Sequence, residues 1–132
     1  MYPYWTKLNK YKSEYFVYSP SDYMSNETFL LTDSIFYSLT NPDPTINPIT
    51  HFRKISNSKY EFKVTNFHEM YKLVKVELTD EKSKIYLWEF INAKGETYKI
   101  EYRTPSNNVK AFKMIVNDCL GQKCIQEFIF DK

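Results

Sequence analysis

The chain has 132 residues, of which 42% are hydrophobic and 26% charged, a composition typical of one soluble globular domain. Its net charge is +2, and 16 lysines accompany only two arginines, so it lacks the strong positive field and the arginine forks that nucleic-acid binding uses. The first thirty residues contain no apolar run of signal-peptide length, and no window of the sequence approaches the length of a membrane span. We therefore expect a cytoplasmic protein that does not bind a membrane, and the charge distribution predicts no binding to nucleic acid.

Two features of the composition are unusual. Aromatic residues make up 18% of the chain, and there are only 2 glycines. Lys, Asn, Tyr, Phe and Ile are all frequent and all have A/T-rich codons, so an AT-rich genome is the favoured explanation of the aromatic excess, and stacking platforms for bases or sugars are the alternative.

Residues 1–20 form an aromatic-rich N-terminal arm with no sustained periodicity, apart from a short strand at 15–18. Large aromatics on such a segment are typical of protein-interface anchors. The predicted partner-binding residues are Tyr2, Tyr4, Trp5 and Tyr11. The alternative is that the arm lies across its own sheet.

Residues 26–39 are predicted to form an amphipathic helix, because Leu31, Ile35 and Leu39 recur at helical spacing. This helix is expected to cover or plug the sheet that follows. Several prolines predict a loop at 40–50, since proline removes backbone donors and restricts the preceding residue.

From residue 51 onward the apolar period is two, which predicts strands at 51–56, 59–66, 70–79, 84–92, 96–104, 109–118 and 123–131. The gaps between them are short, so neighbouring strands should pair antiparallel as a meander. We therefore expect one domain, 1–132, of the mainly β class (all-β or α+β). Its six to seven strands should form a strongly curved meander, barrel-like or sandwich-like, over 51–131.

Matching apolar residues across the gaps predicts the strand registers. It opposes Phe62 to Val74, Val76 to Trp88, Trp88 to Ile100, and Ile100 to Met114. The same registers oppose acids to lysines, namely Glu61 and Glu89 to Lys75, Glu77 to Lys59, Asp80 to Lys84, Glu89 to Lys99, and Glu101 to Lys113. The carboxylates are therefore expected to be solvated ion pairs rather than catalytic acids.

No recognised catalytic, phosphate-binding or metal-binding motif occurs in the sequence. His51 and His68 have no second ligand at a metal-binding spacing. We predict no cofactor, no metal site and no catalytic residue.

The two cysteines lie in CLGQKC, residues 119–124, between the last two predicted strands. The better-matched register there opposes Val116 to Phe128, which takes Cys119 and Cys124 out of direct opposition. The stretch is predicted to be a turn with two free thiols, where Gly121 makes the bend.

A helix followed by an up-and-down meander in about this length resembles the small lipid-binding barrels of the calycin group. The resemblance implies an internal cavity for an apolar ligand, although the last stretch, IQEFIFDK, lacks the Arg-x-Tyr with which the fatty-acid-binding branch holds a carboxylate. The cavity candidates are Tyr86, Trp88, Phe90, Tyr98 and Tyr102. The alternative is that these aromatics form a packed core.

The function predicted first is a non-catalytic protein-binding module, such as an assembly subunit, an inhibitor or an immunity-type protein. Its partner is another protein, and a homo-oligomer is an open alternative. A carrier of an apolar small molecule is the second hypothesis, and an enzyme of unfamiliar type is the third.

Overall fold

In the computed structural model, the described residues are 4–19, 28–38, 45–64 and 72–116. They form ten strands and one 3₁₀ helix. The strands are β1 (Tyr4–Tyr11), β2 (Glu14–Ser19), β3 (Thr28–Leu31), β4 (Ile35–Ser38), β5 (Thr45–Ser56), β6 (Lys59–Val64), β7 (Leu73–Asp80), β8 (Ile85–Ile91), β9 (Thr97–Pro105) and β10 (Lys113–Val116). The helix, η2, spans Ser106–Ala111.

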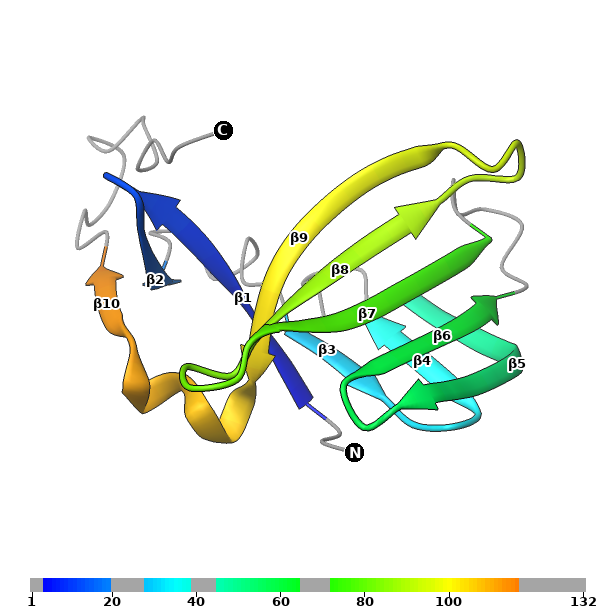
Figure 1. Ribbon diagram of the computed structural model, residues 1–132, viewed down its shortest axis with the longest axis horizontal. Coiled ribbons are helices and arrows are strands. Elements are labelled where there is room, and N and C mark those ends of the chain that lie inside the picture. Colours follow the sequence, from blue (N-terminus) through cyan, green and yellow to red (C-terminus); the bar gives the residue numbers. More distant parts are fainter. Residues whose placement is uncertain (1–3, 20–27, 39–44, 65–71, 117–132) are drawn as a thin grey trace.

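Eight of the strands close into an antiparallel barrel in the order β1-β3-β4-β5-β6-β7-β8-β9 (Figure 1). The closure is the pairing of β9 with β1, in which Trp5 faces Pro105 and Leu8 faces Tyr102. This pairing covers residues 102–105 of β9, whereas the described pairing of residues 97–101 is with β8 alone. The predicted mainly β, barrel-like antiparallel architecture is confirmed.

The N-terminal residues belong to the sheet: the short strand predicted at 15–18 lies within β2, and β1 is a further strand that the sequence did not predict. The first half of β1 pairs with β3, and its second half pairs with β2 along the same edge. Because β1 is longer than the barrel needs, β2 and β10 extend the sheet to one side (left in Figure 1). The β1–β2 turn is made by Lys12 and Ser13, both with positive φ.

The end of the predicted meander is also corrected. In place of one strand over 109–118, the structure has η2 and the short strand β10. β10 pairs parallel with β2, so Lys113 lies beside Phe16 and not opposite Glu101 as predicted. The cysteine turn and the strand predicted at 123–131 lie outside the described residues.

The predicted helix at 26–39 is wrong, because its described residues form the β3–β4 hairpin. Thr32 Oγ1 accepts hydrogen bonds from the backbone N–H groups of Ser34 (3.3 Å) and Ile35 (3.0 Å), and this local turn reverses the chain. Leu31 and Ile35, four residues apart, sit on opposite sides of the turn. Their spacing therefore resembles a helical period although each strand alternates with period two.

The loop predicted at 40–50 is wrong from residue 45 onward, where β5 begins. β5 accommodates Pro48 because its described ladder with β6 starts only at Ile49, opposite Val64. At Pro48 the described pairing is with β4 alone, through Ile35. Proline is tolerated at such one-sided positions of a sheet.

The central registers agree with the sequence. Phe62 faces Val74 and Val76 faces Trp88, as predicted. The predicted charge pairs between β6 and β7 and between β7 and β8 are also in register. The exception is Asp80, which pairs with Ile85 because the register shifts after Leu78.

The β8–β9 register is wrong by one residue beyond the turn. The predicted turn is present, with Gly95 at φ +85° and the Asn92 N–H bonded to the Glu96 carbonyl at 2.9 Å. The register then shifts between Phe90 and Ile91, so Trp88 faces Glu101 rather than Ile100. A one-residue slip turns every later side chain to the other face of the sheet.

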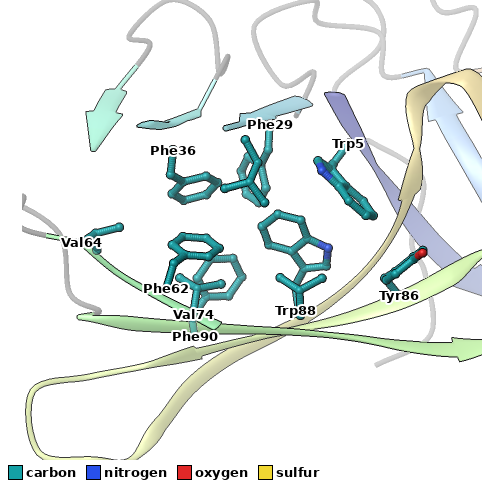
Figure 2. Close-up of a cluster of buried hydrophobic side chains, with 11 residues drawn as sticks. Trp5, Phe29, Phe36, Phe62, Val64, Val74, Tyr86, Trp88 and Phe90 are labelled. Carbon is teal, nitrogen blue, oxygen red and sulfur yellow. The ribbon is translucent and has the colours of Figure 1, made fainter. Parts of the chain in front are cut away.

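The barrel interior is filled by aromatic and branched side chains from all sides, as Figure 2 shows. Its buried members are Trp5, Phe29, Leu31, Phe36, Phe62, Val64, Val74, Val76, Tyr86, Trp88 and Phe90. Neighbouring rings lie 4.7 to 6.5 Å apart between centroids, within the range of favourable aromatic packing. An eight-stranded barrel has an interior just wide enough for side chains to fill it.

A second apolar cluster covers the outer face where β1, β2 and β9 meet. Leu8, Val17 and Ile85 form its buried centre, and Val109 of η2 packs against it. Burial raises the pKa of Tyr15 in this cluster, and the neighbouring Tyr102 hydroxyl raises it further.

Candidate functional site

On one side of the barrel, four described strand segments carry no charged residue, although Asp33 lies exposed in the turn between two of them. These segments are 4–6, Thr28–Leu31, Ile35–Ser38 and 45–48, on the adjacent strands β1, β3, β4 and β5. Their inward residues belong to the core, and their outward residues form the outer surface. We call the outward group the uncharged wall; it consists of Tyr4, Leu30, Ile35, Tyr37, Ile46 and Pro48.

Four of these side chains form a row across the four strands. Tyr4 faces Leu30, Leu30 faces Tyr37, and Tyr37 faces Ile46 in the strand registers. Tyr4 is 48% exposed and Ile46 is 58% exposed, while Leu30 and Tyr37 are half-buried. The row is therefore a continuous strip of aromatic and aliphatic surface open to solvent.

The opposite side of the barrel is built differently. Across β5 to β8, the outward positions Arg53, Glu61, Lys75 and Glu89 alternate in charge from strand to strand. Lys59 faces Glu77 in the same way. Cross-strand pairs of opposite charge suit a solvated sheet face.

The uncharged wall ends where the chain covers itself. At its margin Thr6 and Ser106 share a hydrogen bond of 2.7 Å between their hydroxyls, which ties η2 to β1. Two residues further along the same face of β1, Leu8 is 4% exposed and belongs to the buried centre of the second cluster. Among the described residues, the wall is therefore the part of this outer face that stays open to solvent.

The register slip in β9 brings two charged residues into the barrel. Arg103 is 0% exposed and Glu101 is 7% exposed. Arg103 Nε donates to Glu101 Oε2 at 2.9 Å, and Nη2 lies 2.8 Å from the same oxygen. Arg103 Nη1 also donates to the Trp5 carbonyl at 3.3 Å, and the guanidinium carbon lies 3.3 Å from the centroid of the Phe29 ring. One side chain thus connects β9, β1 and β3 at the barrel closure.

Glu101 is the one buried carboxylate among the described residues, and three cations surround it. Burial has the largest single effect on the pKa of Glu101 and raises it. The positive charges of Arg103, Lys99 and Lys7 together outweigh this effect and hold the pKa below the ordinary value of 4.5. Lys99 Nζ lies 3.3 Å from Glu101 Oε1. The Glu101 carboxylate is consequently ionised, and both of its oxygens have cationic partners. This arrangement suits a structural role and leaves the carboxylate no proton to transfer near neutral pH.

The predicted partner-binding residues are placed as follows. Tyr4 is in the uncharged wall, whereas Trp5 is 1% exposed and belongs to the core. Tyr11 is half-buried at the end of β1, with its ring centroid 6.3 Å from that of Phe16. Tyr2 lies outside the described residues.

The predicted cavity residues separate into two groups. Tyr86, Trp88 and Phe90 point into the packed interior (Figure 2). Tyr98 is 45% exposed, and Tyr102 packs in the second cluster, because the register slip turns both outward.

A hollow of about 510 Å³ lies at one end of the barrel, between the β5–β6 and β7–β8 turns. Tyr86 and Leu78 contribute to its lining, but the other lining side chains are polar or charged. An apolar ligand would find little apolar surface there.

Within the described ranges, no three His, Cys, Asp or Glu side chains come close enough together to hold a metal ion. His51 is exposed on β5, and His68 is outside these ranges. The described part of the chain also has no helix of the length and apolarity needed to cross a membrane.

Comparison with protein-family models, with curated protein sequences and with solved structures finds no match to this chain. The assignment of a site therefore depends on the geometry and charge distribution of the barrel itself.

Sequence reasoning missed most of the uncharged wall. Leu30, Ile35, Tyr37 and Ile46 fall in the segments predicted as helix and loop. The signal that could have found them is residue type, since the stretches TFLL, IFYS and TINP are rich in β-branched and aromatic residues that favour strands.

Proposed function

We propose that this protein is a non-catalytic protein-binding module whose docking surface is the uncharged wall. The observation that carries the proposal is the contrast between the charge-paired side of the barrel and the wall, whose strand segments carry no charged residue. Interface centres are depleted in charged residues and enriched in aromatics, which describes the row through Tyr4 and Tyr37. The partner is a folded protein whose contacting surface is also uncharged at its centre, because a charge facing this wall would lose its water without gaining an ion pair.

Two observations favour this function over a small-molecule carrier. Aromatic side chains occupy the barrel interior, and the hollow at the barrel end is lined mainly by polar groups. The catalytic alternative has less support, since the buried carboxylate of Glu101 is neutralised by Arg103 and Lys99.

The test compares the size of the native assembly in cells that express the tagged chain. Wild-type protein should elute from sizing at a mass well above 15.9 kDa, and Tyr4→Glu should shift it to the mass of the free chain. Tyr98→Glu is the matched control, because Tyr98 is 45% exposed against 48% for Tyr4 but lies outside the wall. A wild-type protein that elutes as a free chain, or an assembly that tolerates Tyr4→Glu, contradicts the proposal.

A further inference from the structure

The hollow at the barrel end carries two opposite charges on an otherwise neutral lining. The charged residues are Glu81 and Lys84, at the β7–β8 turn. The remaining lining residues are Asn57, Ser58, Leu78, Thr79 and Tyr86. A volume of about 510 Å³ lies within the range of small-molecule sites. The hollow therefore offers one carboxylate and one ammonium to a small ligand.

These two charges do not neutralise each other. The ion pairs among the described residues involve neither Glu81 nor Lys84. Both groups therefore keep their hydrogen-bonding capacity for solvent or for a ligand. Charge-assisted hydrogen bonds are stronger than neutral ones, so a ligand that pairs with both groups gains more than a ligand that pairs with one.

The β7–β8 turn is fixed by side chains from β9 and η2. Thr104, which is 0% exposed, donates a hydrogen bond from its hydroxyl to the Lys84 carbonyl at 2.8 Å. Asn108 Nδ2 donates to the Ser83 carbonyl at 2.9 Å. Because these contacts hold the backbone of the turn, less ordering is needed when a ligand binds beside it.

The backbone of Lys84 adopts a conformation that is unfavourable for lysine. Its φ is 56°, in the left-handed region that glycine adopts at little cost. Such residues persist where the surrounding structure enforces them, and they cluster at ligand sites. The hydrogen bond from Thr104 enforces the conformation here. A lysine thus stands where glycine would be more stable, and its ammonium group gives the hollow its cation.

The β5–β6 turn forms the other side of the hollow. The Leu78 N–H donates to the Ser58 carbonyl at 2.8 Å, which ties this turn to β7. Leu78 is half-buried and Tyr86 is 7% exposed, so little apolar surface is open to a ligand. Asn57 is exposed and adds an amide. This side of the hollow therefore suits a neutral polar group.

We propose that the hollow binds a free amino acid with a neutral polar side chain. The ligand carboxylate pairs with Lys84, its ammonium group pairs with Glu81, and its side chain lies toward Asn57 and Ser58. A ligand of one charge sign would be attracted by one of the two charged residues and repelled by the other. The hollow shares no residue with the uncharged wall, so this site is independent of the proposed docking function.

The experiment is an NMR titration of the purified, isotope-labelled chain with three compounds. L-Glutamine carries both charges, L-glutaminamide lacks the carboxylate, and N-acetyl-L-glutamine lacks the ammonium group. L-Glutamine should shift the backbone amide signals of Ser58, Thr79 and Lys84 with one dissociation constant of about 1 mM or lower. The signal of Tyr37, in the uncharged wall, should not move. The other two compounds should bind at least about tenfold more weakly, since each leaves one charged residue without a partner.

Two substitutions connect each charged residue to its group on the ligand. Lys84→Met should weaken L-glutamine binding about tenfold and make it equal to L-glutaminamide binding, because the carboxylate has lost its partner. Glu81→Gln should likewise make L-glutamine and N-acetyl-L-glutamine bind equally. Lys82→Met is the matched control, since Lys82 is exposed in the same turn but does not line the hollow, and it should leave binding unchanged.

Lys84→Gly separates binding from folding. It should be at least as stable as wild type and yet bind L-glutamine as weakly as Lys84→Met does. Circular dichroism establishes that each variant is folded. The proposal is overturned if L-glutamine causes no saturable shift up to about 10 mM, if the three compounds bind wild type equally, or if Lys82→Met weakens binding as much as Lys84→Met.

Discussion

Replacing Arg103 by methionine should be the most damaging single change on β9. The substitution leaves Glu101 buried and removes both close contacts at 2.9 and 2.8 Å, together with the hydrogen bond to the Trp5 carbonyl and the contact with the Phe29 ring. Lys99 remains as a partner, but it is half-exposed and contacts only the other carboxylate oxygen. Breaking a buried ion pair by removing one partner costs about 3–5 kcal/mol, a large share of the roughly 5–15 kcal/mol by which such domains are stable.

The matched variant removes both charges. Arg103→Met combined with Glu101→Leu leaves no buried charge unpaired, and apolar replacement of a whole buried pair is often neutral. We expect the double variant to be more stable than Arg103→Met alone by about 2 kcal/mol or more. Urea unfolding, followed by the fluorescence of the buried Trp5 and Trp88, measures the free energy of unfolding of each protein.

The pH dependence gives a second measure of the same pair. The pKa of Glu101 is lowered in the folded protein, so its contribution to stability is present above the unfolded pKa and is lost as pH falls through the folded value. In Arg103→Met, burial should raise that pKa, so the gap in stability between wild type and variant should narrow on acidification. An Arg103→Met protein that loses less than about 1 kcal/mol, or a double variant no better than the single one, would refute this account of the barrel closure.

Three further predictions follow from local geometry. Trp5→Ala should cost about 3–5 kcal/mol in urea unfolding because Trp5 is 1% exposed, whereas Tyr4→Ala should change stability by less than about 1 kcal/mol; equal effects would contradict their opposite placement in β1. Gly95→Ala should lower the urea midpoint by the equivalent of about 1 kcal/mol, since Gly95 has φ +85° and nothing near its Cβ position; an unchanged midpoint would mean that the turn is not left-handed there. Lys84→Gly should raise thermal stability by about 0.5–1 kcal/mol because Lys84 has φ 56°, and a decrease would contradict this.

The sequence predicted the centre of the barrel well, because three independent signals agree there. Between β6 and β8, apolar residues match across the strands, charges match on the outer face, and the gaps are short. A wrong register would have put Val74 and Val76 in water and lysines in the core. Where one face is buried, the pattern alone specifies the register.

The buried ion pair of Glu101 and Arg103 in β9 could not be predicted, because a β-bulge leaves almost no signal in the sequence. The residues near the turn fit the predicted register, and one extra residue then exchanges Ile100 and Glu101 between the two faces. Exposing Ile100 and burying Glu101 is unfavourable by pattern, and it is stabilised only by Arg103 and the strands that Arg103 contacts. Those contacts come from β1 and β3, distant in sequence.

The uncharged wall was not predicted from the sequence for a related reason. The hairpin turn at Thr32 places Leu31 and Ile35 four residues apart, so a strand pattern interrupted by a turn has the spacing of a helix. Of the wall residues, only Tyr4 was among the four predicted to bind a partner, and that prediction used residue type rather than placement. The wall becomes visible only once β1, β3, β4 and β5 are known to be neighbours.

The central claim, that the uncharged wall is the docking surface, is tested most directly by tyrosine labelling of the native assembly. The ratio of modification at Tyr4 and Tyr37 to modification at Tyr98 should be measured in the assembly and in protein diluted until it dissociates. Tyr4 and Tyr98 are similarly exposed in the single chain, at 48% and 45%. The account predicts that assembly protects Tyr4 and Tyr37 several-fold and leaves Tyr98 unchanged. Equal labelling of all three tyrosines in both states, or protection of Tyr98 alone, would contradict it.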